Sequence, residues 1–270
     1  MRLEYPLRPA PRYGWGRPAH DGLRRWLEAR EPDAAEVVKA LLDPGPDVLA
    51  IPGGRGPSDT LTWDNDWWGG VDAMVQYTAL RDRRPATYLE VGSGFSTRFA
   101  RRTIDDHGLP TRIVSIDPEP RAEIDSLCDV LIRKPLEAVD LAILDEIRSG
   151  DVVLVDCSHT AFMNSDAVVA FLELLPALPA GVLVGIDDVF LPWDYPPSWV
   201  DRWYGEQYLL AAALLAGAAG WRVRFPGFYM TQVSEGRRRF DPLWGHIAPR
   251  MGPYATSFWM EKEISGPAGG

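Results

Sequence analysis

Cysteine, histidine and long apolar runs are scarce in this 270-residue sequence. The two cysteines, Cys128 and Cys157, lie in or beside apolar segments, which favours buried thiols and excludes a disulfide framework or a zinc cluster. No apolar run is long enough to span a bilayer, and the residues after Met1 lack the apolar core of a signal peptide. We therefore expect a cytoplasmic protein with no membrane partner.

Positive charge is also in deficit. Lysine and arginine together number 28 against 38 aspartates and glutamates, so the net charge is −10. Because an acidic surface repels phosphate backbones, we expect no nucleic-acid partner. A small-molecule substrate is the expected partner, and the sequence leaves both a monomer and a homo-oligomer open.

Tryptophan, in contrast, is abundant, with 11 residues. Two interpretations stay open: the rings pack long loops against the core, or they wall a substrate pocket. The residues expected to shape such a pocket are Trp67, Trp68, Trp193, Tyr195, Trp203 and Trp244.

The apolar pattern divides the chain into an N-terminal helical and loop segment (1–85), a ligand-binding domain (86–264) and a disordered tail (265–270). Strands are expected at 87–91, 112–117, 129–132, 151–156, 181–186, 221–225 and 256–262. Helices are expected at 33–42, 70–83, 96–104, 136–148, 167–175 and 204–219. This alternation predicts an α/β, Rossmann-like fold with a doubly wound, mostly parallel sheet. Ligands bind such sheets beyond the carboxyl ends of the strands, and the N-terminal segment is expected to form part of a lid.

A glycine turn follows the first expected strand, in the segment Glu90–Ser96. Glycine lets the backbone approach a ligand closely, and the helix that follows offers free N–H groups. A nicotinamide dinucleotide fingerprint would have a third glycine where this chain has Arg98. The acidic Glu90 would repel a pyrophosphate and suits an ammonium-bearing ligand, which disfavours a nicotinamide-dependent oxidoreductase.

Asp117 ends the second expected strand. An acid at that place in such folds accepts hydrogen bonds from ribose hydroxyls. The alternative is a cap or turn residue before Pro118.

These motifs, within Leu89–Thr97 and Val114–Asp117, resemble those of class I S-adenosylmethionine-dependent methyltransferases. The resemblance continues at Asp156–His159, Ile186–Pro192, 195–196, 206–210 and 257–259. Within that class, the chain is similar to bacterial small-molecule methyltransferases related to the macrocin-type sugar O-methyltransferases. It implies a methyltransferase fold with S-adenosylmethionine as cofactor, Glu90 near the methionine end, Asp117 on the ribose and the turn 134–136 beside the adenine. The cofactor-binding residues that it implies are Glu90, Gly92, Ser93, Gly94, Ser96, Asp117, Pro118, Leu136 and Asp156.

Three carboxylates, Asp156, Asp187 and Asp188, follow the fourth and fifth expected strands. Clustered carboxylates repel one another unless a positive group lies between them. Oxygen ligands of this kind suit Mg²⁺ or Mn²⁺, and the sugar methyltransferases that the chain resembles use such a set in that way. The alternative is that these acids cap helices and order loops.

His159 stands three residues beyond Asp156 and is the expected general base, because an imidazole titrates near neutral pH. A capping or cofactor-packing histidine is the alternative, and His246 is a second candidate base. Asp156 and Asp188 complete the expected catalytic set. We therefore expect O-methylation of a hydroxyl on a natural product or sugar, with N-methylation of an amine or peptide as the alternative. A nicotinamide-dependent oxidoreductase and a non-catalytic binding protein are the hypotheses from other classes.

Overall fold

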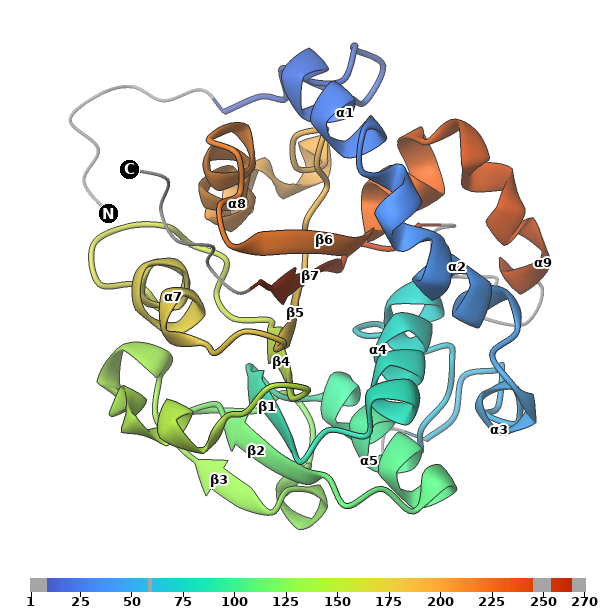
Figure 1. Ribbon diagram of the computed structural model, residues 1–270, viewed down its shortest axis with the longest axis vertical. Coiled ribbons are helices and arrows are strands. Elements are labelled where there is room, and N and C mark those ends of the chain that lie inside the picture. Colours follow the sequence, from blue (N-terminus) through green and yellow to red (C-terminus); the bar gives the residue numbers. More distant parts are fainter. Residues whose placement is uncertain (1–8, 58–59, 245–253, 264–270) are drawn as a thin grey trace.

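The computed structural model describes residues 9–57, 60–244 and 254–263. Its centre is a seven-stranded sheet in the order β3-β2-β1-β4-β5-β7-β6 (Figure 1). The strands are β1 Thr87–Val91, β2 Arg112–Ile116, β3 Val130–Ile132, β4 Val152–Val155, β5 Leu183–Ile186, β6 Trp221–Pro226 and β7 Phe258–Lys262. The first five are parallel, and β7 is antiparallel to both β5 and β6. The predicted doubly wound, mostly parallel sheet is confirmed.

The central strands are buried along their whole length, which explains their continuous apolar sequences. Their register aligns the carboxyl ends: Val91 pairs with both Ile116 and Val155, and Val155 pairs with Ile186. The residues that follow these strands therefore meet at one edge of the sheet.

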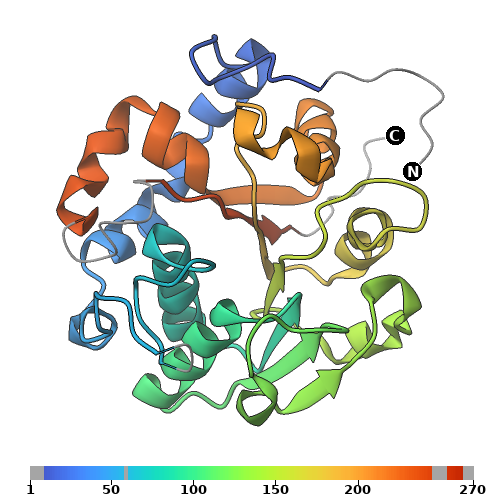
Figure 2. The same ribbon diagram turned by 180° about the vertical axis from the view of Figure 1, so that it is seen from behind.

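Helices cover both faces of the sheet (Figures 1 and 2). They are α1 Asp21–Glu28, α2 Ala35–Leu42, α3 Pro46–Leu49, α4 Gly70–Arg83, α5 Phe95–His107, α6 Asp166–Val169, α7 Leu175–Ala177, α8 Glu206–Leu215 and α9 Asp241–Trp244. The helices α4 and α5 pack together on one face, and α7 and α8 lie on the other. No helix among the described residues is both long enough and apolar enough to cross a membrane.

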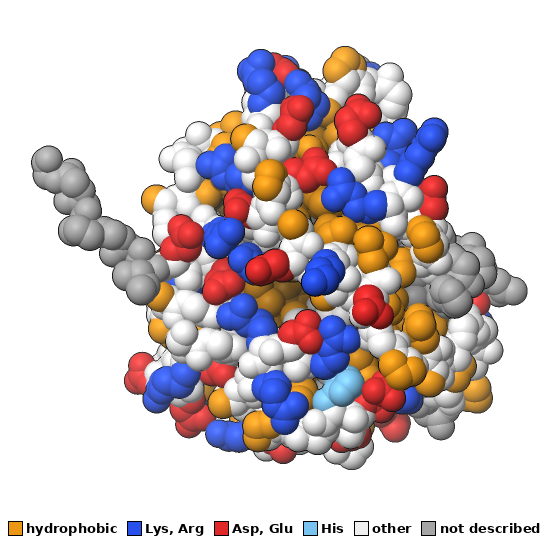
Figure 3. Space-filling view, turned by 45° about the vertical axis from the view of Figure 1, so that its right-hand side comes forward, with side chains coloured by type: hydrophobic (Ala, Val, Ile, Leu, Met, Phe, Trp, Pro, Cys, Tyr) orange, Lys and Arg blue, Asp and Glu red, His pale blue; other side chains and the backbone are white. Residues whose placement is uncertain are grey.

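The N-terminal segment is tied to the loop after β5. The carboxylate of Asp194 accepts the N–H of Tyr13 at 2.9 Å, and its backbone oxygen accepts the indole N–H of Trp15 at 3.0 Å. A Cβ at Gly14 would lie 2.3 Å from the Trp193 ring, so the two segments pack closely. Farther along, α1 contacts α8 and α2 contacts α4. Figure 3 shows acidic and basic side chains interspersed on one face of the molecule.

The prediction of a helix at 136–148 is wrong. The chain there forms two 3₁₀ segments, Leu136–Ala138 and Leu141–Glu146. Val139 is extended between them, and the Asp140 side chain accepts the N–H of Ala142 at 3.0 Å, which starts a new turn in place of a continuous helix.

Other differences from the expected elements are smaller. The helix expected at 204–219 begins two residues later because Trp203 is left-handed, and it ends at Leu215. The helix expected at 167–175 is α6, a π-helical turn (Ala170–Leu174) and α7. The helices α1, α3 and α9 were not expected, and the tail 265–270 lies outside the described residues.

Candidate active site

A cavity of about 680 Å³ opens at the carboxyl edge of the central strands. The predicted cofactor-binding residues in its wall are Gly92, Ser93, Gly94, Ser96, Asp117, Pro118, Leu136 and Asp156. Glu90 is the exception among the predicted set. The turn after β1 and the ends of β2 and β4 thus form one surface, as the strand register requires.

The two glycines of the turn differ in what they face. Gly92 has a φ of +80°, and a Cβ there would lie 1.7 Å from the backbone oxygen of Asp156. The strands β1 and β4 approach too closely at this point for any side chain. A Cβ at Gly94, by contrast, would meet no atom within 4 Å, beside the N-terminus of α5. The fold requires Gly92, whereas Gly94 leaves space for a ligand.

Asp117 bridges two backbone N–H groups. Its carboxylate accepts from Ser93 at 2.6 Å and from Glu119 at 2.7 Å. An ionised carboxylate has about four acceptor sites, so capacity remains for hydroxyls of a ligand. The side chain therefore orders the turns on both sides of it and also forms part of the cavity wall.

Glu90 lies behind the turn and does not line the cavity, contrary to the prediction. It is fully buried, accepting hydrogen bonds from the hydroxyls of Tyr88, at 2.9 Å, and of Thr97. Burial raises the pKa of Glu90 to about 7. Because side chains alternate along a strand, Glu90 shares a face with Tyr88, which α4 covers through a hydrogen bond from Gln76. Thr97 also accepts the Gly94 N–H at 3.0 Å, so Glu90 supports the turn from below.

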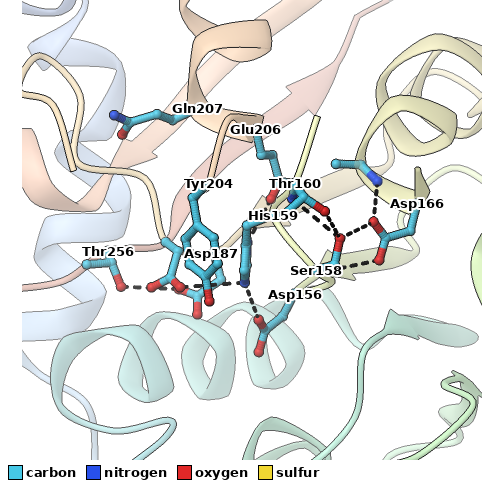
Figure 4. A network of polar contacts seen from close by, with 12 residues as sticks. Asp156, Ser158, His159, Thr160, Asp166, Asp187, Tyr204, Glu206, Gln207 and Thr256 are labelled. Atoms are coloured by element: carbon cyan, nitrogen blue, oxygen red, sulfur yellow. Dashed lines mark hydrogen bonds and ion pairs between the residues drawn. The ribbon is translucent and has the colours of Figure 1, made fainter. Parts of the chain in front are cut away.

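Asp156, Asp187 and Asp188 line the cavity together, as their strand-end positions predict. His159 lies between two of them. Its Nε2 is 3.2 Å from Asp156 (Figure 4), and the same nitrogen is 3.5 Å from Asp188. Its Nδ1 is 2.8 Å from a carboxylate oxygen of Glu206, the first residue of α8. A histidine thus supplies the positive group between the carboxylates.

The predicted Mg²⁺ or Mn²⁺ set is not supported. Within the described ranges, no group of three or more His, Cys, Asp or Glu side chains could hold a metal ion. The imidazole of His159 contacts Asp156 and Asp188, and Asp187 instead accepts the Thr256 hydroxyl at 3.2 Å. A protonated imidazole relieves the repulsion between the carboxylates, which is the role that was expected of a metal ion.

The geometry of His159 favours a role other than the predicted general base. Its side chain is 2% exposed and does not line the cavity. Burial alone lowers the pKa of His159, but the carboxylates of Asp156, Glu206 and Asp188 outweigh it and raise the pKa well above its ordinary value. A protonated ring with both nitrogens on carboxylates has no free lone pair to accept a proton. We therefore interpret His159 as a residue that positions its neighbours.

Asp188 reaches the cavity with a partly exposed carboxylate. Its φ of 53° places it in the left-handed region, which costs a non-glycine residue energy and marks a constrained backbone. Burial raises the pKa of Asp188 to about 6, against the opposing effect of the His159 charge. A carboxylate that ionises just below neutral pH is suited to accept a proton from a substrate.

Aromatic rings wall the cavity beyond the carboxylates. Phe190 and Trp199 meet edge to face with their centroids 5.2 Å apart, and Trp199 and Tyr204 do so at 5.7 Å. The guanidinium of Arg202 lies 3.8 Å from the centroid of the Trp199 ring. These residues belong to the loop between β5 and α8.

The aromatic residues predicted to shape an acceptor pocket do not all line the same cavity. Trp67 and Trp68 line this cavity, whereas Tyr195 and Trp203 line a second cavity of about 460 Å³. Trp193 packs against Phe228 at 5.2 Å. The Trp244 side chain and His246 lie outside the described residues.

Several residues of the cavity wall were not among the residues expected from the sequence. They are Asp66, Phe190, Trp199, Arg202, Tyr204, Tyr254 and Thr256. Phe190 stood within the resemblance, directly after Asp187-Asp188, and that position was the available signal. No pattern in the sequence indicates that Tyr254 and Thr256, which precede β7, line the same cavity as Asp187 and Asp188.

Residues 89–189 match the family described as a methyltransferase domain. That stretch contains the glycine turn, Asp117 and the Asp187-Asp188 pair, whose side chains and backbone form the cavity. This part of the chain is therefore similar to methyltransferase domains. The seven-stranded sheet has the Rossmann-like fold that the resemblance implies.

No curated protein matches this sequence. Among solved structures it is similar to the methyltransferase PaMTH1 of Podospora anserina bound to SAH, with 15% identity and a TM-score of 0.43, over 93% of this chain and 100% of that one. It is also similar to an O-methyltransferase of Bacillus cereus in complex with SAH, with 12% identity and a TM-score of 0.42, over 89% and 100%. A third is the plantazolicin methyltransferase BpumL in complex with SAH, with 14% identity and a TM-score of 0.40, over 90% and 99%.

Proposed function

We propose that this chain is an S-adenosylmethionine-dependent methyltransferase, that it methylates a hydroxyl group of a small molecule and that Asp188 is the general base. The observation that carries the proposal is the position of Asp188: its carboxylate lines the cavity, with a pKa raised by burial to about 6. Methyl transfer to a hydroxyl requires removal of its proton as the oxygen attacks. Asp188 is ionised near neutral pH and has the strength for that step.

The cavity fits S-adenosylmethionine at the glycine turn. The space in front of Gly94 allows close approach of a ligand, and Asp117 retains acceptor capacity for ribose hydroxyls. Gly94, Ser96, Asp117 and Leu136 are the residues that would hold it. S-adenosylmethionine, when bound, supplies an electrophilic methyl group on a sulfonium.

The protein's own contribution is alignment, exclusion of water and proton removal. The aromatic wall of Phe190, Trp199 and Tyr204 buries the acceptor beside Asp188. His159 holds the carboxylates in place from behind. The proton of the acceptor hydroxyl passes to the carboxylate of Asp188, whose raised pKa suits a general base that acts near neutral pH.

N-methylation of an amine is the second candidate, because three carboxylates line the same cavity. Burial is the main cause of the raised pKa of Asp187, and the charges of the neighbouring Asp188 and Asp156 raise this pKa further. A protonated amine would relieve this repulsion. Such an acceptor must then lose a proton before it can attack.

The test is a product assay with S-adenosylmethionine carrying a deuterated methyl group. Paired acceptors that differ only in a hydroxyl or an amine on the same scaffold are incubated with the enzyme, and products are identified by intact mass and fragmentation. We expect label on oxygen, with kcat rising as the pH passes through about 6. Label on nitrogen alone would overturn the proposal and support the second candidate.

A further inference from the structure

A compact joint connects the loop after β4 to the N-terminus of α8. The backbone oxygen of His159 accepts the N–H groups of Gly205, at 2.7 Å, and of Glu206, at 3.1 Å. His159 has a φ of 59°, in the left-handed region, and the joint maintains it there. A Cβ at Gly205 would lie 3.1 Å from the Cβ of Ala161, so little space remains between the two segments.

The side chains tighten the same joint. Glu206 is 1% exposed and its carboxylate lies 2.8 Å from Nδ1 of His159. The ring of Tyr204, with its centroid 4.7 Å from that of the imidazole, covers one face of His159 (Figure 4). The other ring nitrogen, Nε2, faces Asp156 and Asp188. The imidazole therefore connects a carboxylate outside the cavity to two carboxylates that line it.

Glu206 is an expensive residue to bury for structural reasons alone. The second oxygen of its carboxylate is buried and has no hydrogen-bond partner among the described residues. A buried carboxylate loses its hydration, and one ion pair repays that loss only in part. An apolar residue would pack α8 without this cost, so the charge itself has a use.

We propose that Glu206 is a positioning residue that acts through His159: it fixes the imidazole between Asp156 and Asp188 and so holds both carboxylates in place at the cavity. The proposal rests on the proposed role of Asp188 as the base. The groups that face His159 are Asp156 and Asp188 from the strand ends, Glu206 from α8 and the Tyr204 ring. Of these, only Glu206 does not line the cavity.

The test uses Glu206→Gln, which keeps the shape and an acceptor for the Nδ1 hydrogen but removes the charge. We expect kcat to fall by about 10- to 150-fold, the usual worth of a hydrogen bond to a charged group, with the SAH dissociation constant and the acceptor KM unchanged. Glu173→Gln, an exposed position on the same face of the sheet, is the matched control and should behave as wild type.

A second readout needs no acceptor. The chain has four histidines, so ¹⁵N spectra of the imidazoles are simple, and His159→Gln assigns the signal of His159. Wild type should keep both ring nitrogens of His159 protonated at neutral pH. Glu206→Gln should lower the pH at which the ring loses its proton by about 1–3 units, because one opposite charge is removed.

The outcomes separate this proposal from the proposed function. A folded Glu206→Gln variant with wild-type kcat and an unchanged His159 titration would overturn it. A parallel loss of SAH affinity, kcat and thermal stability would also overturn it, since that pattern indicates structural support alone. Failure to methylate any hydroxyl leaves the imidazole readout intact and counts against Asp188 as base, not against the joint. Should Glu206→Gln not fold, Glu206→Asp is used instead, because it retains the charge on a shorter side chain. The same two measurements, kcat and the titration of His159, then decide for or against the proposal.

Discussion

The glycine turn allows one prediction to be worked out quantitatively, because two glycines two residues apart face different surroundings. Gly92→Ala would place its Cβ 1.7 Å from the Asp156 backbone oxygen at a φ of +80°. The left-handed backbone costs an alanine about 1–2 kcal/mol, and displacing packed backbone costs about 1–3 kcal/mol more. The sum, about 2–5 kcal/mol, is a large part of the stability of a typical domain. At about 2–4 °C per kcal/mol the melting temperature should fall by about 4–20 °C.

Gly94→Ala and Gly94→Val should act on the ligand. Their Cβ meets no protein atom within 4 Å and extends into the cavity. Overpacking of this kind costs about 1–3 kcal/mol, which weakens SAH binding by about 5- to 150-fold, more for valine than for alanine. The melting temperature should fall less than in Gly92→Ala.

Differential scanning fluorimetry and isothermal titration with SAH measure the two effects on the same samples. Gly54→Ala is the matched control, because its Cβ also meets no atom within 4 Å and its φ lies outside the left-handed region, but it lies outside the cavity. Wild-type SAH affinity in a folded Gly94→Val variant would refute the assignment of the turn to the cofactor. A wild-type melting temperature for Gly92→Ala would refute the close approach of β1 and β4.

Three further predictions concern the carboxylates. Asp117→Ala should weaken SAH binding by about 10- to 150-fold, the worth of a hydrogen bond to a charged group, and unchanged affinity by calorimetry would contradict its ribose role. Asp188→Asn should lower kcat by about 10²–10⁴-fold with SAH affinity retained. The wild-type pH–rate profile should rise through about 6, because the base acts in its ionised form, and the rise should be absent in the variant. Dialysis against EDTA should leave kcat unchanged, since His159 lies between Asp156 and Asp188; activity that is lost on chelation and restored by Mn²⁺ would show that reasoning to be wrong.

Sequence patterns predicted best what is encoded locally. The expected bounds of α4 and β1 coincide with the observed Gly70–Arg83 and Thr87–Val91. Helical and strand periodicity depend on neighbours a few residues apart, and the strand–turn–helix around Gly92 is a short-range unit. The strand-end acids could be placed at one edge because parallel strands run in the same direction. The prediction of a helix at 136–148 was wrong because one capping interaction, in which the Asp140 side chain accepts the N–H of Ala142, outweighed an otherwise helical composition.

The sequence by itself determined the fold class, the glycine turn and the positions of Asp117, Asp156 and Asp188 at the cavity. Only the tertiary structure decided what surrounds them. It placed Glu90 behind the glycine turn, and it brought Glu206 into contact with His159, 47 residues away in the sequence. It also placed the imidazole of His159 against carboxylates that were expected to bind a metal ion. The reason is physical: periodicity reports which face of an element is buried, whereas the partner of a buried charge depends on how distant elements pack.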